Sequence, residues 1–148
     1  MKYIYLTASF LVLVVTVAVA QSAEQITSIT FTKQNRGFLD ELIISRDSVQ
    51  GFVEHHRLPE STQQYATEID QDDWARLMLA LVDVPLDQID GLQSPTTNRA
   101  HYGAIHSTIT IAFEDGRTIT HSFDDENPHP DLRPLLDAIL QYRIASGR

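Results

Sequence analysis

The sequence predicts an α+β fold, in which an antiparallel sheet of meander and hairpin strands packs one face against two amphipathic helices as a two-layer sandwich. Three observations predict it. The first half of the chain is rich in short β-branched segments, residues 70–85 and 131–140 repeat apolar residues with a helical period, and residues 105–123 have the pattern of a β-hairpin. Both helices need a sheet face on which to bury their apolar stripes.

Strands are expected in the first part of the domain. Residues 26–32 and 39–45 are rich in β-branched side chains, and the polar, glycine-ended segment 33–37 between them predicts a turn. Residues 49–55 are expected to form a third strand. Over residues 57–68 the periodicity is weak, so a fourth edge strand and a long loop are equally consistent with this segment.

A helix is expected after residue 70. Asp70 has the position of an N-cap, and Asp72 and Asp73 favour the positive end of the helix dipole. Pro85 is expected to end the helix, and residues 86–92 would add one short turn. The stripe that would face the sheet consists of Trp74, Leu77, Met78, Leu81 and Val82.

The hairpin of residues 105–123 depends on its turn. A two-residue loop at Asp115 and Gly116 would mix apolar and hydroxyl side chains on each face. A three-residue loop over residues 114–116, with Gly116 in the left-handed conformation, keeps the faces separate. The buried face then pairs Ile111 with Ile119 and Ser107 with Phe123, and the solvent face pairs Thr110 with Thr120 and Ala112 with Thr118.

The last helix is expected to begin at Asp131, after the polar loop of residues 124–130. Pro134 would lie in its first turn, where a proline is tolerated because its missing N–H has no helical partner there. The apolar stripe of this helix consists of Leu132, Leu135, Leu136, Ile139 and Leu140.

Residues 1–20 have the features of a secretory signal peptide. Lys2 precedes an apolar run that closes on the small residues Ala18 and Ala20. Cleavage before Gln21 would leave residues 21–148 as a single domain, exported to the periplasm or the medium. After cleavage, no membrane insertion is expected.

Composition narrows the classes of partner. The chain of 148 residues has a net charge of −9, which disfavours nucleic acid and anionic lipid because both require Lys and Arg to neutralise phosphates. It contains no cysteine, so disulfides, thiolate metal ligands and a lipid-modified N-terminal cysteine are excluded. The mature protein is therefore expected to be soluble and stabilised by packing.

Histidine and aspartate residues around the hairpin suggest a metal hypothesis. The three-residue loop places His106 opposite Asp124, with His101, Asp125 and His129 in the flanking loops. Imidazole and carboxylate together suit zinc or copper, although the spacing matches no recognised ligand motif and such exposed pairs are more often solvated. The alternative function is a metal-binding or metal-buffering periplasmic protein that uses His106, Asp124 and His129.

Catalytic residues and cofactors are not predicted. No G-x-S-x-G motif occurs, and the glycines after residue 20 are scattered singly, so there is no phosphate loop. The adjacent acids Asp72 and Asp73, and Asp124 and Asp125, are more often caps and turns than acid/base pairs. His121 falls on the apolar face of the hairpin and is expected to be a hydrogen-bonded core residue.

The polar loop of residues 94–102 is the best candidate for contact with a partner. It is long, it carries Arg99, His101 and Tyr102, and it ends at the hairpin, which would hold it rigid. A simple surface crossover would have the same composition. We expect the partner to be another protein, bound through these three side chains.

The order of elements resembles a group of small exported bacterial proteins. It comprises strands, a helix bearing Trp74, a Ser-Pro loop, a hairpin with a Glu-Asp-Gly-Arg turn, and a C-terminal Pro-Asp-Leu-x-x-Leu-Leu helix. The same order also looks like the emfourin-type inhibitors of thermolysin-like metallopeptidases. This resemblance, over most of residues 26–142, implies an exported non-catalytic binding protein, for example a peptidase inhibitor. A structural accessory of an envelope complex, docked through the threonine-rich outer face of the sheet, is a third hypothesis.

Overall fold

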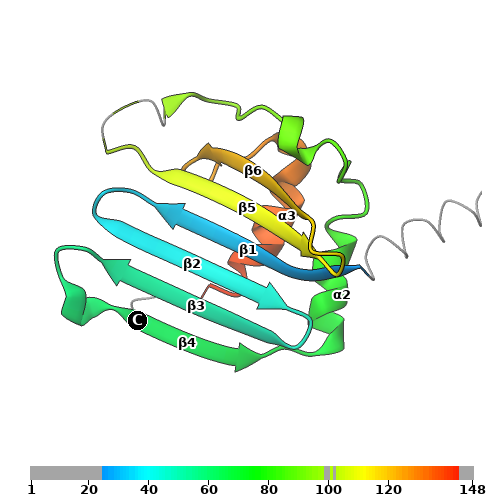
Figure 1. The fold of residues 1–148 in the computed structure, drawn as a ribbon, viewed down its shortest axis with the longest axis horizontal. Helices are drawn as coiled ribbons and strands as arrows, with labels where there is room; N and C mark the ends of the chain where they lie inside the picture. Colours follow the sequence, from blue (N-terminus) through cyan, green and yellow to red (C-terminus); the bar gives the residue numbers. More distant parts are fainter. Residues whose placement is uncertain (1–24, 99–100, 102, 144–148) are drawn as a thin grey trace, which may run out of the picture.

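The computed structural model describes residues 25–98, 101 and 103–143, so the expected signal peptide of residues 1–20 lies outside the described residues. Six strands form one antiparallel sheet in the order β4-β3-β2-β1-β5-β6 (Figure 1). Together with two short α-helices, this sheet confirms the predicted α+β class. The strands are β1 (Ile26–Gln34), β2 (Phe38–Ser45), β3 (Ser48–His55), β4 (Gln63–Glu68), β5 (His106–Phe113) and β6 (Thr118–Asp124).

Among the first four strands, one boundary differs from the prediction, and one segment that the prediction left open forms a strand. β1 continues two residues beyond residue 32, which places Lys33 in the sheet and not in the expected turn. The turn is short because Asn35 Oδ1 accepts hydrogen bonds from the backbone N–H groups of Gly37, at 2.7 Å, and Phe38, at 3.1 Å. The segment of residues 57–68, for which the sequence allowed a strand or a loop, contains the edge strand β4.

The β5–β6 hairpin has the predicted turn and register. Gly116 has a φ of +82°, and Phe113 N donates a hydrogen bond to Arg117 O at 2.9 Å. Residues 114–116 therefore form the expected three-residue loop. The predicted cross-strand pairs are present, Ile111 with Ile119, Ser107 with Phe123, Thr110 with Thr120 and Ala112 with Thr118.

Helix α2 (Gln71–Leu79) begins where predicted and ends earlier. Asp70 Oδ1 accepts a hydrogen bond from Asp73 N at 2.8 Å, which confirms the N-cap. The prediction that Pro85 ends the helix is wrong, because the backbone beyond the helix changes to turns in which N–H groups donate three residues back. This change of period leaves Val82 45% exposed, although the helical stripe predicts that it is buried.

The remaining helical segments are short. The C-terminal helix, expected from Asp131, begins as the 3₁₀ helix η4 (Pro130–Leu132) and continues as α3 (Arg133–Leu140). Two further 3₁₀ helices are η1 (Pro59–Ser61) and η2 (Ile89–Gly91), and η2 is the short turn expected within residues 86–92. Within the described residues, no helix combines the length and the apolar character that a membrane span needs.

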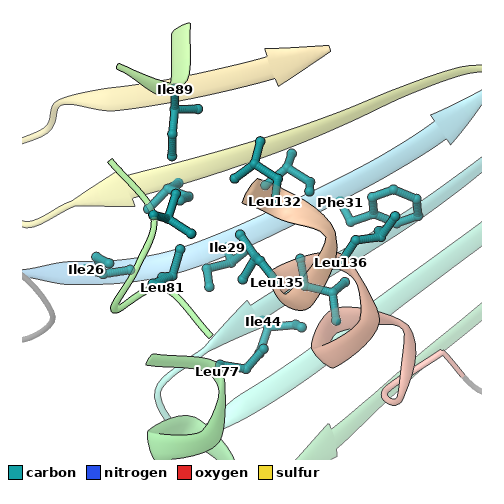
Figure 2. Close-up of a cluster of buried hydrophobic side chains, with 14 of the residues drawn as sticks. Ile26, Ile29, Phe31, Ile44, Leu77, Leu81, Ile89, Leu132, Leu135 and Leu136 are labelled. Carbon is teal, nitrogen blue, oxygen red and sulfur yellow. The ribbon is translucent and has the colours of Figure 1, made fainter. Parts of the chain in front are cut away.

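One hydrophobic core joins the helices to the sheet. α3 lies behind the strands, with α2 near one end of the sheet (Figure 1). Figure 2 shows Leu135 and Leu136 of α3 together with Ile29 and Ile44 of the sheet, and all four are fully buried. Burial of each such side chain stabilises the fold by roughly 1.5–3 kcal/mol. The core residues that were predicted from the two apolar stripes are Trp74, Leu77, Leu81, Leu132, Leu135, Leu136 and Ile139.

Candidate binding surface

The loop predicted to contact a partner is described in part. Arg99 and Tyr102 lie outside the described residues, so the structure places only His101 of the three predicted contacts. His101 N donates a hydrogen bond to Asn98 O at 2.9 Å, and His101 O accepts one from Ala104 N at 3.2 Å. His101 therefore occupies a turn at the end of the loop, with an exposed side chain.

The side chain of Asp124 binds residues 96–98 of this loop to the hairpin. Asp124 is buried, and its Oδ2 accepts hydrogen bonds from Asn98 N, at 2.7 Å, and from the Thr96 hydroxyl. A buried carboxylate needs such donors, because a buried charge without hydrogen bonds is costly. The last residue of β6 therefore holds residues 96–98 in place, as expected for a loop supported by the hairpin.

The residues of the metal hypothesis have other contacts. His106 pairs with Asp124 across the hairpin, as predicted, but His106 is exposed and the Asp124 carboxylate accepts hydrogen bonds from the loop. His129 Nδ1 lies 3.5 Å from Asp131 Oδ2. In the part of the chain that the structure describes, no group of three or more His, Cys, Asp or Glu residues is placed to hold a metal ion.

His121 lies in the core, as the hairpin register predicts. It is 2% exposed, and its ring stacks on Phe123 with 5.5 Å between the ring centroids. Its Nε2 accepts a hydrogen bond from His129 N at 3.4 Å. These contacts give His121 a structural role, in packing β6 against the segment that leads to η4.

The face of the sheet opposite the core, here named the open face, is rich in hydroxyl groups on β1, β5 and β6. Three cross-strand rows occupy this region, and eight of their nine positions are Ser or Thr. Facing hydroxyl oxygens on β5 and β6 lie 3.2–3.3 Å apart. The rows are Ser28, Ala112 and Thr118, then Thr30, Thr110 and Thr120, then Thr32, Thr108 and Ser122. The predicted polar face of the hairpin thus continues onto β1.

On β2, β3 and β4 the open face contains a hollow of about 450 Å³, here named the β4 hollow. Two cross-strand rows form it, Glu41 with Phe52 and Gln64, and Ile43 with Gln50 and Ala66. Phe52 and Ile43 provide apolar surface, and the glutamate and glutamines provide a polar rim. This site was not predicted from the sequence. The available signal was a pair of adjacent large apolar residues, Ile43 with Ile44 on β2 and Phe52 with Val53 on β3, which places one such residue on each face of the strand.

On the core side of the same strands, the Tyr65 ring occupies the space beside Gly51. The two residues face each other across β3 and β4, and a Cβ atom at position 51 would overlap the Tyr65 ring. Tyr65 Oη also donates a hydrogen bond to Tyr142 O at 3.4 Å. The ring therefore covers the glycine and links β4 to the segment after α3.

A group of five charged side chains, here named the ion cluster, lies at the β6–α3 connection. Lys33 Nζ lies 2.9 Å from both Asp125 Oδ1 and Glu126 Oε1. Arg143 Nη1 lies 2.8 Å from Glu126 Oε1, and Arg143 Nε lies 3.2 Å from Asp40 Oδ2. This cluster could not be predicted from the sequence, because its members come from four separate segments and Lys33 was expected in a turn.

Burial and ion pairing shift three pKa values in the ion cluster. Burial alone would lower the pKa of Lys33, but its hydrogen bonds to Glu126 and Asp125 outweigh burial and raise it. Burial alone would raise the pKa of Glu126, but hydrogen bonds from Arg143 and Lys33 lower it. Burial raises the pKa of Asp40, against the attraction of Arg143. The cluster therefore pairs opposite charges, although Nε and Nη2 of Arg143 are buried without a hydrogen-bond partner.

Comparison with models of protein families gives no match to this chain. Comparison with curated protein sequences gives no similar protein either.

Proposed function

We propose that this chain is an exported, non-catalytic binding protein whose partner is another protein. The observation that supports it best is the difference between the two faces of the sheet: one contributes to the core, and the other is open and carries the β4 hollow. Apolar surface with a polar rim, held on paired strands, is typical of binding surfaces. We also propose that sheet and helices form a two-layer sandwich, which the shared core supports.

The loop that carries Arg99, His101 and Tyr102 is proposed as a second contact region. The hydrogen bonds from Asn98 and Thr96 to Asp124 support this, because a loop that is already ordered loses less entropy on binding. The resemblance to emfourin-type inhibitors suggests a mechanism, in which the loop occludes the active site of a peptidase.

Affinity capture tests the proposed function. Tagged residues 21–148 serve as bait for the exported proteins of the source organism, and we expect stoichiometric retention of one protein. If that protein is a peptidase, its hydrolysis of a fluorogenic peptide should fall as the bait is added. Retention of no protein at stoichiometric level would contradict the proposal.

Three variants assign the contact region. Replacing Arg99, His101 and Tyr102 together by alanine should weaken retention if the loop binds the partner. Phe52→Ala should weaken retention of the partner if the partner binds at the β4 hollow. Thr110→Ala should weaken retention if the partner binds at the hydroxyl rows. Each variant is compared with the wild type by urea unfolding, so that a loss of binding is separated from a loss of folding.

A further inference from the structure

The two edges of the sheet differ in how they are covered. At β6, η2 lies alongside the strand, and Asp90 Oδ1 accepts a hydrogen bond from Thr120 N at 2.6 Å. Among the strands of the described residues, β4 has β3 on one side and none on the other. It contains no Pro, Lys or Arg, which often protect an edge from pairing, and Glu68 is its single charged residue. β4 is therefore an edge that another strand can join.

The rows of the β4 hollow end at this edge. One row ends at Gln64 and the other at Ala66, and both residues are exposed. A strand added beside β4 would place a side chain opposite each of them, on the open face, because directly opposite residues of neighbouring strands share a face. Those side chains would extend the two rows and lie at the margin of the hollow.

The charge of this region favours a basic partner. Glu41, Glu54 and Glu68 lie on the open face of β2, β3 and β4. The six strands contain a single Lys and no Arg, and the side chain of that residue, Lys33, belongs to the ion cluster. None of the ion pairs among the described residues includes any of the three glutamates. The net charge of −9 adds to the attraction of a cationic segment.

We propose that β4 binds an extended segment of the partner protein as an added strand, and that this segment alternates basic and apolar residues on the open face. The inference rests on the proposed function. Main-chain hydrogen bonds would provide affinity, as in other cases of strand addition to a sheet edge. A basic side chain would lie opposite Glu68, and an apolar one opposite Ala66, in line with Gln50 and Ile43.

A synthetic peptide tests strand addition directly. The probe is a fluorescent eight-residue peptide in which threonine alternates with lysine and valine, and its binding to residues 21–148 is followed by anisotropy. We expect saturable binding, with NMR shift changes at the β4 amides. Replacing the lysines by glutamate should weaken binding at least about tenfold, because the open face then repels the peptide.

N-methylation separates main-chain pairing from charge attraction. Two versions of the peptide carry N-methyl groups on alternate residues, along one edge or along the other. Only the version methylated on the edge that faces β4 should lose binding, since the other edge remains free. Equal binding of both versions and of the unmethylated peptide would overturn strand addition.

Variants of the protein complete the test. Glu68→Gln should weaken peptide binding roughly two- to fivefold. Glu41→Gln should have a smaller effect, because β3 and β4 separate Glu41 from the added strand, and Glu114→Gln, at the distant hairpin turn, should have none. Sedimentation equilibrium shows whether the protein forms a dimer. If it does, if Glu68→Lys dissociates the dimer and if the peptide does not bind, then a second copy occupies the edge and the proposal is overturned. The loop variant and Glu68→Lys are also compared in the affinity capture. If the loop variant abolishes capture of the partner and Glu68→Lys does not, the proposed function stands but strand addition is overturned.

Discussion

Arg143 Nη1 lies 2.8 Å from Glu126 Oε1, and the guanidinium carbon of Arg143 lies 5.3 Å from the centroid of the Phe31 ring. These contacts join the segment after α3 to the loop after β6 and to β1. The side chains of Arg143 and Glu126 are 25% and 32% exposed, so water and salt screen the pair less than they would a surface pair. The pair therefore fixes the end of the described chain against the sheet.

Removal of this contact should destabilise the fold. We expect Arg143→Ala to lower the free energy of unfolding by about 1–3 kcal/mol, because the partly buried Glu126 carboxylate loses a charged hydrogen-bond donor. Urea unfolding at neutral pH measures the change. The matched control is Arg133→Ala, whose pair with Asp137 is exposed at 3.8 Å and should contribute less than about 0.5 kcal/mol. Equal losses of unfolding free energy in the two variants would contradict a special stabilising role for the contact between Arg143 and Glu126.

Acid should remove the contribution of Glu126. Burial opposes ionisation of Glu126, but the hydrogen bonds from Arg143 and Lys33 outweigh it and hold its pKa below the ordinary value of 4.5. A lowered carboxyl pKa stabilises the fold above pH 4.5, and the contribution is lost as the pH falls through the folded pKa. Glu126→Gln should therefore be less stable than the wild type at neutral pH. The difference, measured by urea unfolding over a pH series, should shrink below pH 4.5.

Asp40 should show the opposite dependence. Burial raises its pKa above the ordinary value of 3.8, against the attraction of Arg143, so the folded state binds this proton more tightly than the unfolded state does. Ionised Asp40 therefore lowers stability above its folded pKa, and the effect disappears as the pH falls. Asp40→Asn should therefore have a higher free energy of unfolding than the wild type at neutral pH, and this difference should disappear in acid. Urea unfolding over the same pH series measures this difference. If the stability of Asp40→Asn relative to the wild type changes with pH in the same direction as that of Glu126→Gln, the causes given for the two pKa shifts are wrong.

The predicted parts of the fold are those set by local pattern. The three-residue turn with Gly116, the pairing of Ile111 with Ile119 and the N-cap Asp70 each depend on residues close in sequence. Helical period identified the buried stripes for the same reason, and it failed at Val82, where the helix had already ended. Local sequence therefore sufficed for the hairpin turn and its register, for the N-cap and for most of the buried helical positions.

The parts that could not be predicted depend on residues distant in sequence. These four residues, Lys33, Asp40, Glu126 and Arg143, meet only because β1 is a neighbour of β2 and the segment after α3 returns to these strands. The β4 hollow required β4 itself, whose sequence has little hydrophobic period. The three predicted loop contacts, Arg99, His101 and Tyr102, stay predictions.

The close approach of Gly51 and Tyr65 predicts a coupled effect on stability. Gly51→Ala should lower the free energy of unfolding by about 1–3 kcal/mol, because the added Cβ displaces the Tyr65 ring. In a Tyr65→Thr background the same substitution meets no ring and should cost much less. A double-mutant cycle by urea unfolding gives the coupling energy, and additive effects would contradict the contact.

The anchor at Asp124 predicts a local change in the loop. Asp124→Ala removes the acceptor of the Asn98 N–H and the Thr96 hydroxyl, which should cost about 1–3 kcal/mol of local stability and accelerate hydrogen exchange of the Asn98 amide about five- to 150-fold. Thr96→Val removes one of the two donors and leaves the Asn98 bond, so its effect on that amide should be smaller.

Exchange at a β1 amide such as that of Ile29, in the centre of the sheet, serves as the control for global unfolding. If Asn98 exchanges at the wild-type rate in Asp124→Ala, other contacts hold the loop. If the amide exchanges faster and captured partner is lost while Ile29 stays protected, an ordered loop is required for binding. Binding retained with a released loop would instead assign the contact to the open face of the sheet.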